Sequence, residues 1–386
     1  MPKNPKVAVL IMESVFTHKI LKGVREYVLK CATPWHIHMA DPRPEVFARL
    51  KEWKPDGILA YATQAILPEL NTWDGPLVNI SNRETVADAP NVRLDNVAVG
   101  GMAGKHLQAL GYRQFAFCGI NKSRFSDERM QGFQNVLERA GQILYFPDRD
   151  FRPCSVEEWK SWKARANYIL SWLQPLPRPL AVFCANDETA KELADICLQA
   201  GIPVPEQIAI LGVDNSVLCE LTIPSLSSIE ANAQRQGFEA ADTLDRLMSG
   251  QQRFEPITLI PPLSVAVRES TEITALHDAD LADAVRFIRE HFSHSIDVRD
   301  ILKKVPVSRR TLERKFQESL GRSPQQEIRR VRLDRARELL IHTDLSVRVI
   351  SQRTGFANPQ RFAYVFKDVY GESPLRFRKT KAGIVH

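Results

Sequence analysis

The first 270 residues alternate short apolar runs with stretches of helical spacing. Seven runs have the length and composition of buried strands: 6–12, 35–40, 56–61, 76–80, 115–120, 179–187 and 208–215. The stretches with apolar residues on one helix face are 18–30, 44–53, 63–71, 97–110, 127–141 and 188–200. Alternation of strands and helices at this spacing is typical of βαβ units, so it predicts an α/β fold with parallel sheets.

The pattern changes across residues 254–280, a segment that contains prolines and then polar residues. Beyond it every periodic stretch is helical, and the predicted helices are 278–292, 297–305, 309–320, 324–343, 346–354 and 359–370. We therefore expect a first domain over 1–270, a linker at 271–277 and an all-α domain over 278–386.

The all-α part contains an internal repeat of apolar and turn positions, at an offset of 49 or 50 residues. Val298, Ile301, Val307, Leu312, Phe316, Gly321, Ser323 and Pro324 match Val347, Ile350, Phe356, Phe362, Phe366, Gly371, Ser373 and Pro374. Glycine suits the left-handed position that ends a helix, and Ser followed by Pro suits the start of the next one. Each copy, over about 297–320 and 346–370, is therefore predicted to be a helix, a tight turn and a second helix.

The net charge also differs between the two predicted parts of the chain. From Asp278 to the C-terminus there are 23 Lys and Arg against 14 Asp and Glu, a net charge of +9, whereas the preceding residues carry −3 of the total of +6. A basic third of this kind favours a module that contacts phosphates, although helical surfaces are also often rich in arginine.

Polar residues follow several predicted strands of the first domain, for example Asn186 and Asp187, and Asp214. Ligands bind at the carboxyl ends of parallel strands, but polar residues there are equally common as helix caps. Asp95, which precedes the predicted helix 97–110, is better explained as a cap.

Four runs of the first domain together resemble the sugar-binding core of LacI/GalR repressors. They are 92–120, 126–133 ("SDERMQGF"), 185–215 and 222–248. The resemblance covers about 5–270 and implies a two-lobed periplasmic-binding-protein fold, with chain crossings near 93, 225 and 255. The lobes that it implies are 5–93 with 226–255, and 94–225 with 256–270. Those repressors begin with a helix-turn-helix, whereas this chain begins at its first strand, so we expect its DNA-binding unit elsewhere.

The same resemblance implies the ligand-binding residues Phe16, Arg129, Asn186, Asp187 and Asp214. A guanidinium and carboxylates suit a polyol because they form paired, charge-assisted hydrogen bonds with adjacent hydroxyls. An aromatic ring such as Phe16 can stack on the apolar face of a sugar. Without the resemblance, Arg129 would be assigned to a helix surface and Asp187 to a helix cap.

The duplicated helix-turn-helix joined by one long helix resembles the DNA-binding domain of the AraC/XylS family over about 278–380. Pro306 departs from the glycine that this family usually has in the first turn. One helix of each copy would enter the major groove. The base-reading candidates are Arg309, Arg310, Glu313 and Arg314 in the first copy and Gln360, Arg361 and Tyr364 in the second. The phosphate-contacting candidates are Lys303, Lys304, Lys315, Arg329, Arg376 and Arg378, for each of which an ordinary solvated surface role is the alternative.

We expect neither a membrane protein, nor a secreted protein, nor an enzyme. The chain has no run of 18 apolar residues and no cleavage site near its start, so we expect no membrane contact and a cytoplasmic, nucleoid-associated protein. The six cysteines show no C-x-x-C spacing and are predicted to be reduced thiols. The segment "GGMAGKH" (100–106) lacks phosphate-loop spacing, and no catalytic or metal-binding arrangement is evident. We therefore expect no enzyme, no metal and no cofactor.

A sensor of this kind placed ahead of an AraC-type reader resembles the xylose-operon activators of the XylR type. The resemblance implies a sugar-responsive transcription regulator that activates pentose genes. Its expected partners are double-stranded DNA, a monosaccharide for which D-xylose is the first candidate, a second copy of the chain and RNA polymerase. A regulator of a different small ligand remains the alternative. A DNA-alkylation sensor would need a reactive cysteine with zinc-type neighbours, and a transport binding protein would need a signal peptide.

Overall fold

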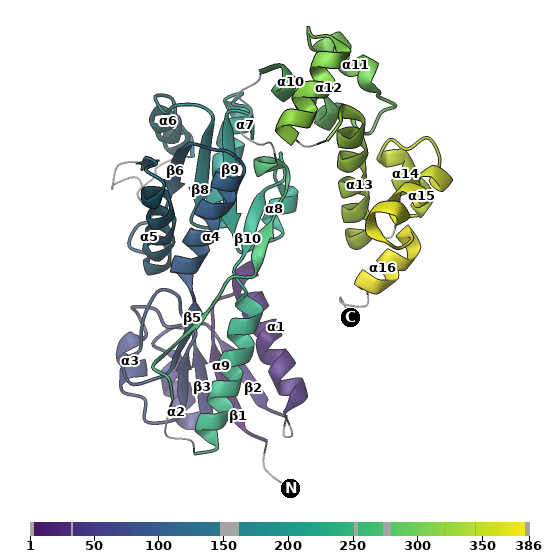
Figure 1. Cartoon of the computed structure of the whole chain (residues 1–386). Helices are drawn as coiled ribbons and strands as arrows, with labels where there is room; N and C mark the ends of the chain where they lie inside the picture. The colour runs from purple at the N-terminus through teal and green to yellow at the C-terminus, as the bar shows by residue number, and fades with distance from the viewer. Residues whose placement is uncertain are drawn as a thin grey trace. The chain divides into compact units, whose positions relative to one another are not determined.

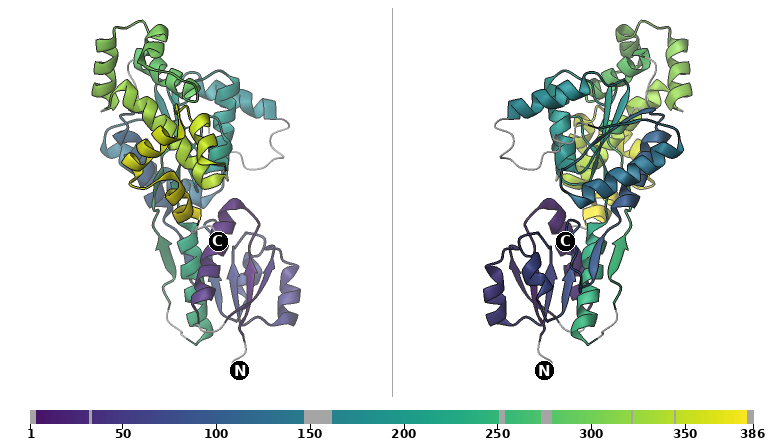
Figure 2. Two further views of the ribbon diagram at one scale, coloured as in Figure 1. Left: turned by 90° about the vertical axis from the view of Figure 1, so that its right-hand side faces the viewer. Right: turned by 90° about the vertical axis from the view of Figure 1, so that its left-hand side faces the viewer.

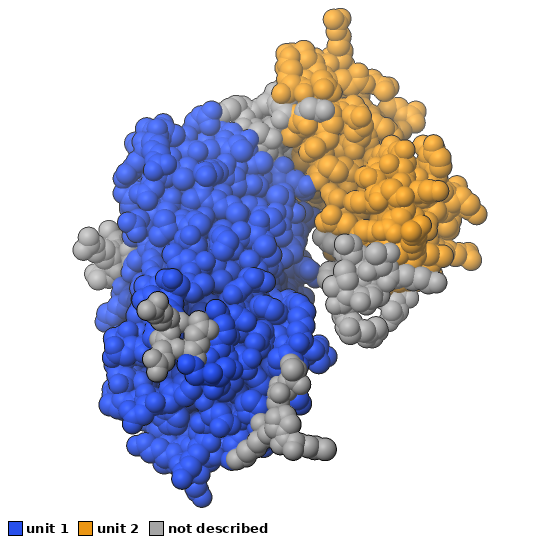
Figure 3. Space-filling model, turned by 60° about the horizontal axis from the view of Figure 1, so that its bottom comes forward, with its two compact units in different colours: residues 1–275 blue, residues 276–386 orange. Residues whose placement is uncertain are grey.

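The computed structural model divides the chain into two compact units, Met1–Ala275 and Leu276–His386 (Figures 1 and 3). It describes residues 4–31, 34–146, 162–250, 254–272, 279–320, 322–343 and 345–382. Most of the expected linker, residues 273–277, lies outside these ranges, as does Gly321, the predicted terminator of a helix in the first repeat.

The first unit consists of two lobes, and lobe 1 is built on a parallel sheet that has six strands among the described residues. In the order β11-β5-β4-β3-β1-β2 these strands are Ile257–Ile260, Asn91–Leu94, Leu77–Asn79, Gly57–Ala60, Lys6–Leu10 and His36–Ala40. The helices of lobe 1 are α1 (Val15–Lys30), α2 (Val46–Trp53), α3 (Leu67–Asn71) and α9 (Ala233–Met248). Helices cover both faces of the sheet, which explains why β3 is apolar throughout and β1 is apolar after Lys6 (Figure 2).

Lobe 2 repeats this architecture. Its strands, in the order β12-β10-β9-β8-β6-β7, are Ser264–Ala266, Ser227–Glu230, Ile208–Val213, Leu180–Cys184, Gln114–Cys118 and Leu144–Tyr145. Only β12 runs antiparallel to its neighbour within the described part of this sheet. The helices are α4 (Asn96–Ala109), α5 (Arg124–Arg139), α6 (Trp162–Leu173), α7 (Asp187–Gln199), α8 (Leu218–Leu221) and a 3₁₀ turn at Glu269–Thr271. The predicted α/β fold with parallel sheets is confirmed.

Two of the predicted lobe boundaries are wrong. Strand β10 pairs with β9 in lobe 2, so the chain crosses to lobe 1 after Glu230 and not near 225. Strand β11 pairs with β5 in lobe 1, so the last crossing follows Ile260 and not 255. Apolar spacing shows that a short strand exists, but the sheet that it joins is decided by its pairing partner, which is distant in sequence.

Glycines bring two helices of lobe 2 into close contact. A Cβ atom on Gly100 of α4 would lie 1.9 Å from the carbonyl oxygen of Arg129 in α5, and a Cβ atom on Gly132 would lie 2.0 Å from that of Val97. Only glycine permits two helix backbones to approach this closely. The glycine-rich segment 100–106 is thus a packing face of α4, and it fixes the part of α5 that carries Arg129.

The second unit contains the predicted helices. They are α10 (Ala279–His291), α11 (Val298–Lys304), α12 (Arg309–Leu320), α13 (Pro324–His342), α14 (Val347–Arg353) and α15 (Pro359–Tyr370), followed by α16 (Pro374–Ala382), which had no predicted counterpart. The Ser-Pro pairs act as predicted, because the Ser323 side chain caps α13 and the Ser373 side chain caps α16. Gly371 ends α15 in the left-handed conformation, with φ +77°.

Each helix-turn-helix has its own core. In the first, Leu312 and Phe316 of α12 are fully buried, and in the second, Phe362 and Phe366 of α15 are fully buried against α13. The apolar positions of the repeat therefore hold the second helix of each motif in place, and the intervening polar positions are left on its outer face.

Candidate ligand site and nucleic-acid interface

A cavity of about 260 Å³ lies where the two lobes of the first unit meet. The structure places all five predicted ligand residues on its wall: Phe16 comes from α1, Arg129 from α5, Asn186 and Asp187 from the start of α7, and Asp214 from the end of β9. Strands β8 and β9 are neighbours in the sheet, so the residues that follow them meet at one edge.

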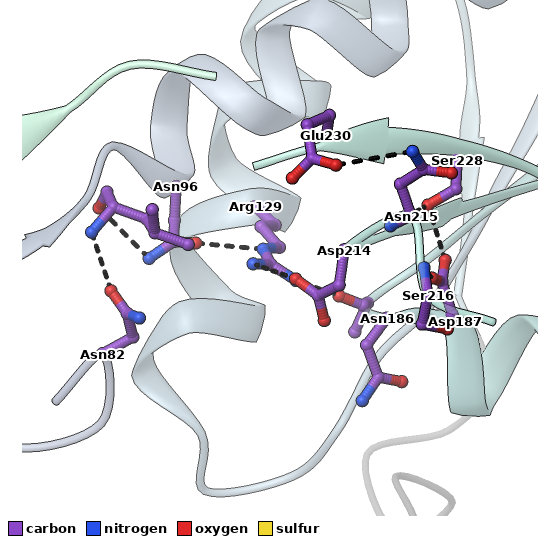
Figure 4. Close-up of polar contacts among 12 residues, drawn as sticks. Asn82, Asn96, Arg129, Asn186, Asp187, Asp214, Asn215, Ser216, Ser228 and Glu230 are labelled. Atoms are coloured by element: carbon purple, nitrogen blue, oxygen red, sulfur yellow. Dashed lines mark hydrogen bonds and ion pairs between the residues drawn. The ribbon is translucent and has the colours of Figure 1, made fainter. Parts of the chain in front are cut away.

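Arg129 and Asp214 form the centre of the site (Figure 4). The Arg129 side chain is 3% exposed; its Nε donates to Asn96 Oδ1 at 3.0 Å and its Nη1 donates to the carbonyl oxygen of Ala185. Its Nη2 lies 3.7 Å from Asp214 Oδ1, which is too long for a hydrogen bond. Among the described residues, this Asp214 oxygen has no hydrogen-bond partner. The pair is thus held apart and can accept a polar group.

Burial raises the pKa of the Asp214 carboxyl to about 7, against the opposing charges of Arg129 and Lys19. Nearby carboxylates of Asp187 and Glu230 raise the pKa further. Near neutral pH this group is therefore divided between its charged and neutral forms, and a ligand that donates hydrogen bonds would favour the charged form.

Asn186 and Asp187 have structural roles as well. Asn186 Oδ1 caps α7, accepting from the backbone nitrogen of Thr189 at 3.0 Å. Asp187 is 2% exposed, and its carboxylate accepts from Ser216 N at 2.7 Å and from Ser228 Oγ at 2.6 Å. The cap interpretation is therefore correct for Asn186, while Asp187 mainly holds the loop that follows β9.

Aromatic and polar residues that the sequence did not single out complete the wall. They are Tyr61, Asn82, Arg83 and Phe125. The Arg129 guanidinium lies 5.0 Å from the centre of the Phe125 ring, and that of Arg83 lies 5.7 Å from it, so both cations interact with the same aromatic ring. Phe125 lies four residues before Arg129, one helical turn away; this spacing was the available signal.

A further layer supports Arg129. The amide of Asn96 accepts from Arg129 and donates to Glu128 Oε2 at 3.2 Å, and Arg93 Nη1 lies 3.3 Å from Glu128 Oε1. Asn96 begins α4 directly after Asp95, whose side chain caps that helix as predicted. The first chain crossing thereby fixes the orientation of the buried arginine.

In the second unit, the outer faces of α12 and α15 carry the predicted base-reading residues, all of them exposed: Arg309, Arg310, Glu313, Arg314, Gln360, Arg361 and Tyr364. Arg309 Nε pairs with Glu313 Oε1 at 2.9 Å, and Arg314 Nη1 pairs with Glu318 Oε2 at 3.0 Å. The Tyr364 side chain is the most exposed aromatic of its helix, at 68%. Exposed pairs of this kind are weak, so they would readily exchange for bases or phosphates.

Several predicted phosphate-contacting residues pair inside the unit, and one of them is Arg329 of α13, which pairs with Asp368 of α15. Lys315 pairs with Asp280 of α10 at 2.7 Å and is largely buried. Arg378 donates to the carbonyl oxygens of Leu340 and Leu345, at 3.3 and 2.6 Å, at the end of α13. Lys304 is exposed and remains a candidate for phosphate contact.

Two other kinds of feature concern the part of the chain that the structure describes. No helix there is long and apolar enough to cross a membrane. No cluster of three or more His, Cys, Asp or Glu residues there could hold a metal ion.

A two-lobed binding domain with a polar cleft, joined to a double helix-turn-helix unit, defines a ligand-responsive transcription regulator. A family model of a periplasmic binding protein-like domain matches residues 105–271, and a family model of a helix-turn-helix domain matches residues 301–380. Over 380 residues the chain is 30% identical to the xylose operon regulatory protein of Escherichia coli (strain K12), with 96% of this chain and 95% of that protein covered. The protein of the same name from Haemophilus influenzae is 29% identical, with 97% and 98% covered.

The solved structure of the xylose-binding transcription activator xylR matches with a TM-score of 0.78 at 29% identity, covering 98% of this chain and 99% of that one. The chain belongs to the family of xylose operon regulatory proteins. The resemblances to a sugar-binding sensor and to a helix-turn-helix reader are thereby confirmed, and the relatives are transcription regulators.

Proposed function

We propose that this chain is a cytoplasmic activator of xylose catabolism genes that binds D-xylose in the cleft of its first unit and DNA through α12 and α15. The observation that carries the proposal is the Arg129–Asp214 pair on the wall of one small cavity, in which the Asp214 oxygen beside the buried cation has no hydrogen-bond partner within the described ranges. Adjacent hydroxyls of a sugar would bridge the 3.7 Å gap by accepting from the arginine and donating to the carboxylate.

The size and charge of the cavity favour a small neutral ligand. At about 260 Å³ it lies below the range of about 300–1,000 Å³ found for drug-sized ligands, which suits a single monosaccharide ring. Its wall carries four carboxylates (Glu13, Asp187, Glu188 and Asp214) against two guanidinium groups (Arg83 and Arg129). A sugar phosphate or sugar acid would therefore meet unfavourable charge, whereas a pentose would not. Phe16 and Phe125 offer apolar faces on which the ring can stack.

The reading helices would use different chemistry in the two motifs. Arg310 and Arg314 suit guanine, Glu313 suits cytosine, and Gln360 suits adenine, while Tyr364 can contact a thymine methyl group. We propose further that the active form is a homodimer formed through the first unit and that bound protein contacts RNA polymerase. Both proposals rest on the class of protein.

A DNA-alkylation sensor is disfavoured by the state of the thiols. Burial raises the pKa of Cys184, Cys197 and Cys219, the latter two to about 12, so these thiols stay protonated and unreactive. Cys154 lies outside the described residues.

Titration calorimetry with D-xylose tests the proposed ligand. We expect saturable binding with a dissociation constant between about 1 µM and 1 mM, a binding free energy of about −8 to −4 kcal/mol. D-ribose and D-glucose should bind more weakly, and anionic D-xylonate should bind weakest because of the excess of carboxylates. Tighter binding of the anion, or no binding of any pentose, would contradict the assignment.

A further inference from the structure

Lys19 of α1 does not line the ligand cavity, but it links the two lobes through the Asp214 loop. Its Nζ donates to the carbonyl oxygens of Asp214 and Asn215, at 2.6 and 3.2 Å, and to Glu230 Oε2 at 2.6 Å. An ammonium group has three protons, so all of its donors are used. Lys19 is in lobe 1, whereas its three partners follow β9 and end β10 in lobe 2.

The loop that Lys19 contacts has an unusual backbone. Asp214 has φ +101° and Asn215 has φ +45°. Two consecutive residues therefore have a positive φ, a backbone conformation that residues other than glycine rarely adopt. Such a conformation persists only where its surroundings fix it. This conformation is what turns the Asp214 side chain into the cavity as β9 ends.

Other bonds to this loop come from lobe 2. Asp214 N donates to the carbonyl oxygen of Ile229 at 2.9 Å, and Asn215 N donates to Ser228 Oγ at 2.9 Å. Arg268 donates to Asn215 Oδ1 at 2.7 Å. Lys19 adds a link from lobe 1, and separating the lobes would break that link while leaving the lobe 2 bonds intact.

We propose that Lys19 is a positioning residue of the ligand site: by holding the Asp214 and Asn215 carbonyls across the lobe interface, it aims the Asp214 carboxylate into the cleft when the lobes are closed. This inference rests on the proposed function for the identity of the ligand, whereas the contacts of Lys19 do not depend on that function. Lys19 does not line the ligand cavity. It acts through the loop, and it lines a separate depression together with Lys22 and Asn215.

The charge of Lys19 provides a signature that a merely structural residue would lack. The charged groups that face Asp214 are Arg129 of α5, Lys19 of α1, Asp187 of α7 and Glu230 of β10, with Tyr61 beyond β3. The Lys19 cation lowers the pKa of Asp214, and the Glu230 carboxylate raises it. Removing each charge should therefore move the titration of Asp214 in opposite directions.

The test compares Lys19→Met with Lys22→Met, an exposed lysine of the same helix. In the wild type, D-xylose affinity should fall by up to tenfold per pH unit below about 7, because the sugar hydroxyls donate to the ionised Asp214. In Lys19→Met, affinity at pH 8 should fall at least tenfold and the pH midpoint should move upward, since the Asp214 pKa rises. Glu230→Gln should move the midpoint downward, and Lys22→Met should leave both quantities unchanged.

Carbon-13 NMR of the Asp214 carboxyl in the ligand-free full chain measures the titration midpoint of Asp214 in each variant without a sugar. If the wild type fails to bind D-xylose but Lys19→Met raises this titration midpoint and Glu230→Gln lowers it, the proposed ligand is wrong and the role of Lys19 stands. If Lys19→Met binds D-xylose with wild-type affinity and pH profile, or if both variants shift the midpoint in the same direction, the positioning role is overturned.

Discussion

Arg129→Met is expected to raise the dissociation constant for D-xylose at least 100-fold and to abolish the sugar-dependent rise in melting temperature. The substitution removes two or more charge-assisted hydrogen bonds to the ligand, each worth about 1.5–3 kcal/mol. It also removes the cation that opposes the effect of burial on the pKa of Asp214, so this carboxyl should become protonated and a weaker acceptor. Calorimetry and thermal unfolding with and without D-xylose measure both effects.

Arg139→Met is the matched control, because Arg139 is an exposed residue in the last turn of the same helix. It should bind D-xylose as the wild type does. Arg129→Met should also lower the melting temperature of the ligand-free protein, since Asn96 and the carbonyl of Ala185 lose their buried donor. Wild-type affinity in a folded Arg129→Met protein would show that the sugar binds elsewhere.

Arg310→Ala is expected to weaken binding to the preferred DNA sequence by about 1–3 kcal/mol, or about 5- to 150-fold, and to relax specificity at one base pair. Arg310 is exposed on α12, whose inner face is fixed by Leu312 and Phe316, so the loss should come from the contact and not from unfolding. Binding to a library with single base-pair changes measures the specificity.

Lys304→Ala provides the contrast, since a phosphate contact carries no sequence information. It should weaken all sequences equally and reduce the slope of log affinity against log salt by about 1. A uniform loss in Arg310→Ala would show that Arg310 contacts the backbone and that another residue of α12 reads the base.

The apolar pattern predicted most of the fold because both units obey simple periodicities. Repeated positions such as Leu312 and Phe362 became equivalent core residues, and Gly371 and Ser323 ended and restarted helices as predicted. The sheet that each of strands β10 and β11 joins was not predictable from apolar spacing. Strands β10 and β11 are short and follow one another along the chain with only α9 between them, yet they pair in different sheets, and such pairing is a non-local property.

The site could be predicted where a local motif carried it. Arg129 and Asp214 were predicted from the sequence because each lies in a run that resembles the sugar-binding core of LacI/GalR repressors. In the structure Arg129 Nη2 lies 3.7 Å from Asp214 Oδ1. Arg83 and Tyr61 follow strands of the other lobe without any distinctive spacing, so only the folded chain shows that they line the same cavity. Arg378 illustrates the converse: it was predicted to contact phosphate, whereas its guanidinium donates to the backbone carbonyls of Leu340 and Leu345.

The proposed coupling is that a sugar bound between the lobes changes DNA binding by the helix-turn-helix unit. It is tested most directly by fluorescence titration of the full chain against DNA that the wild type selects from random sequence in the presence of D-xylose. We expect D-xylose to change the wild-type affinity by about 5- to 150-fold, the usual range of coupling between two sites, and to leave the affinity of Arg129→Met unchanged. An equal response to D-xylose in both proteins, or no response in the wild type, would contradict the account.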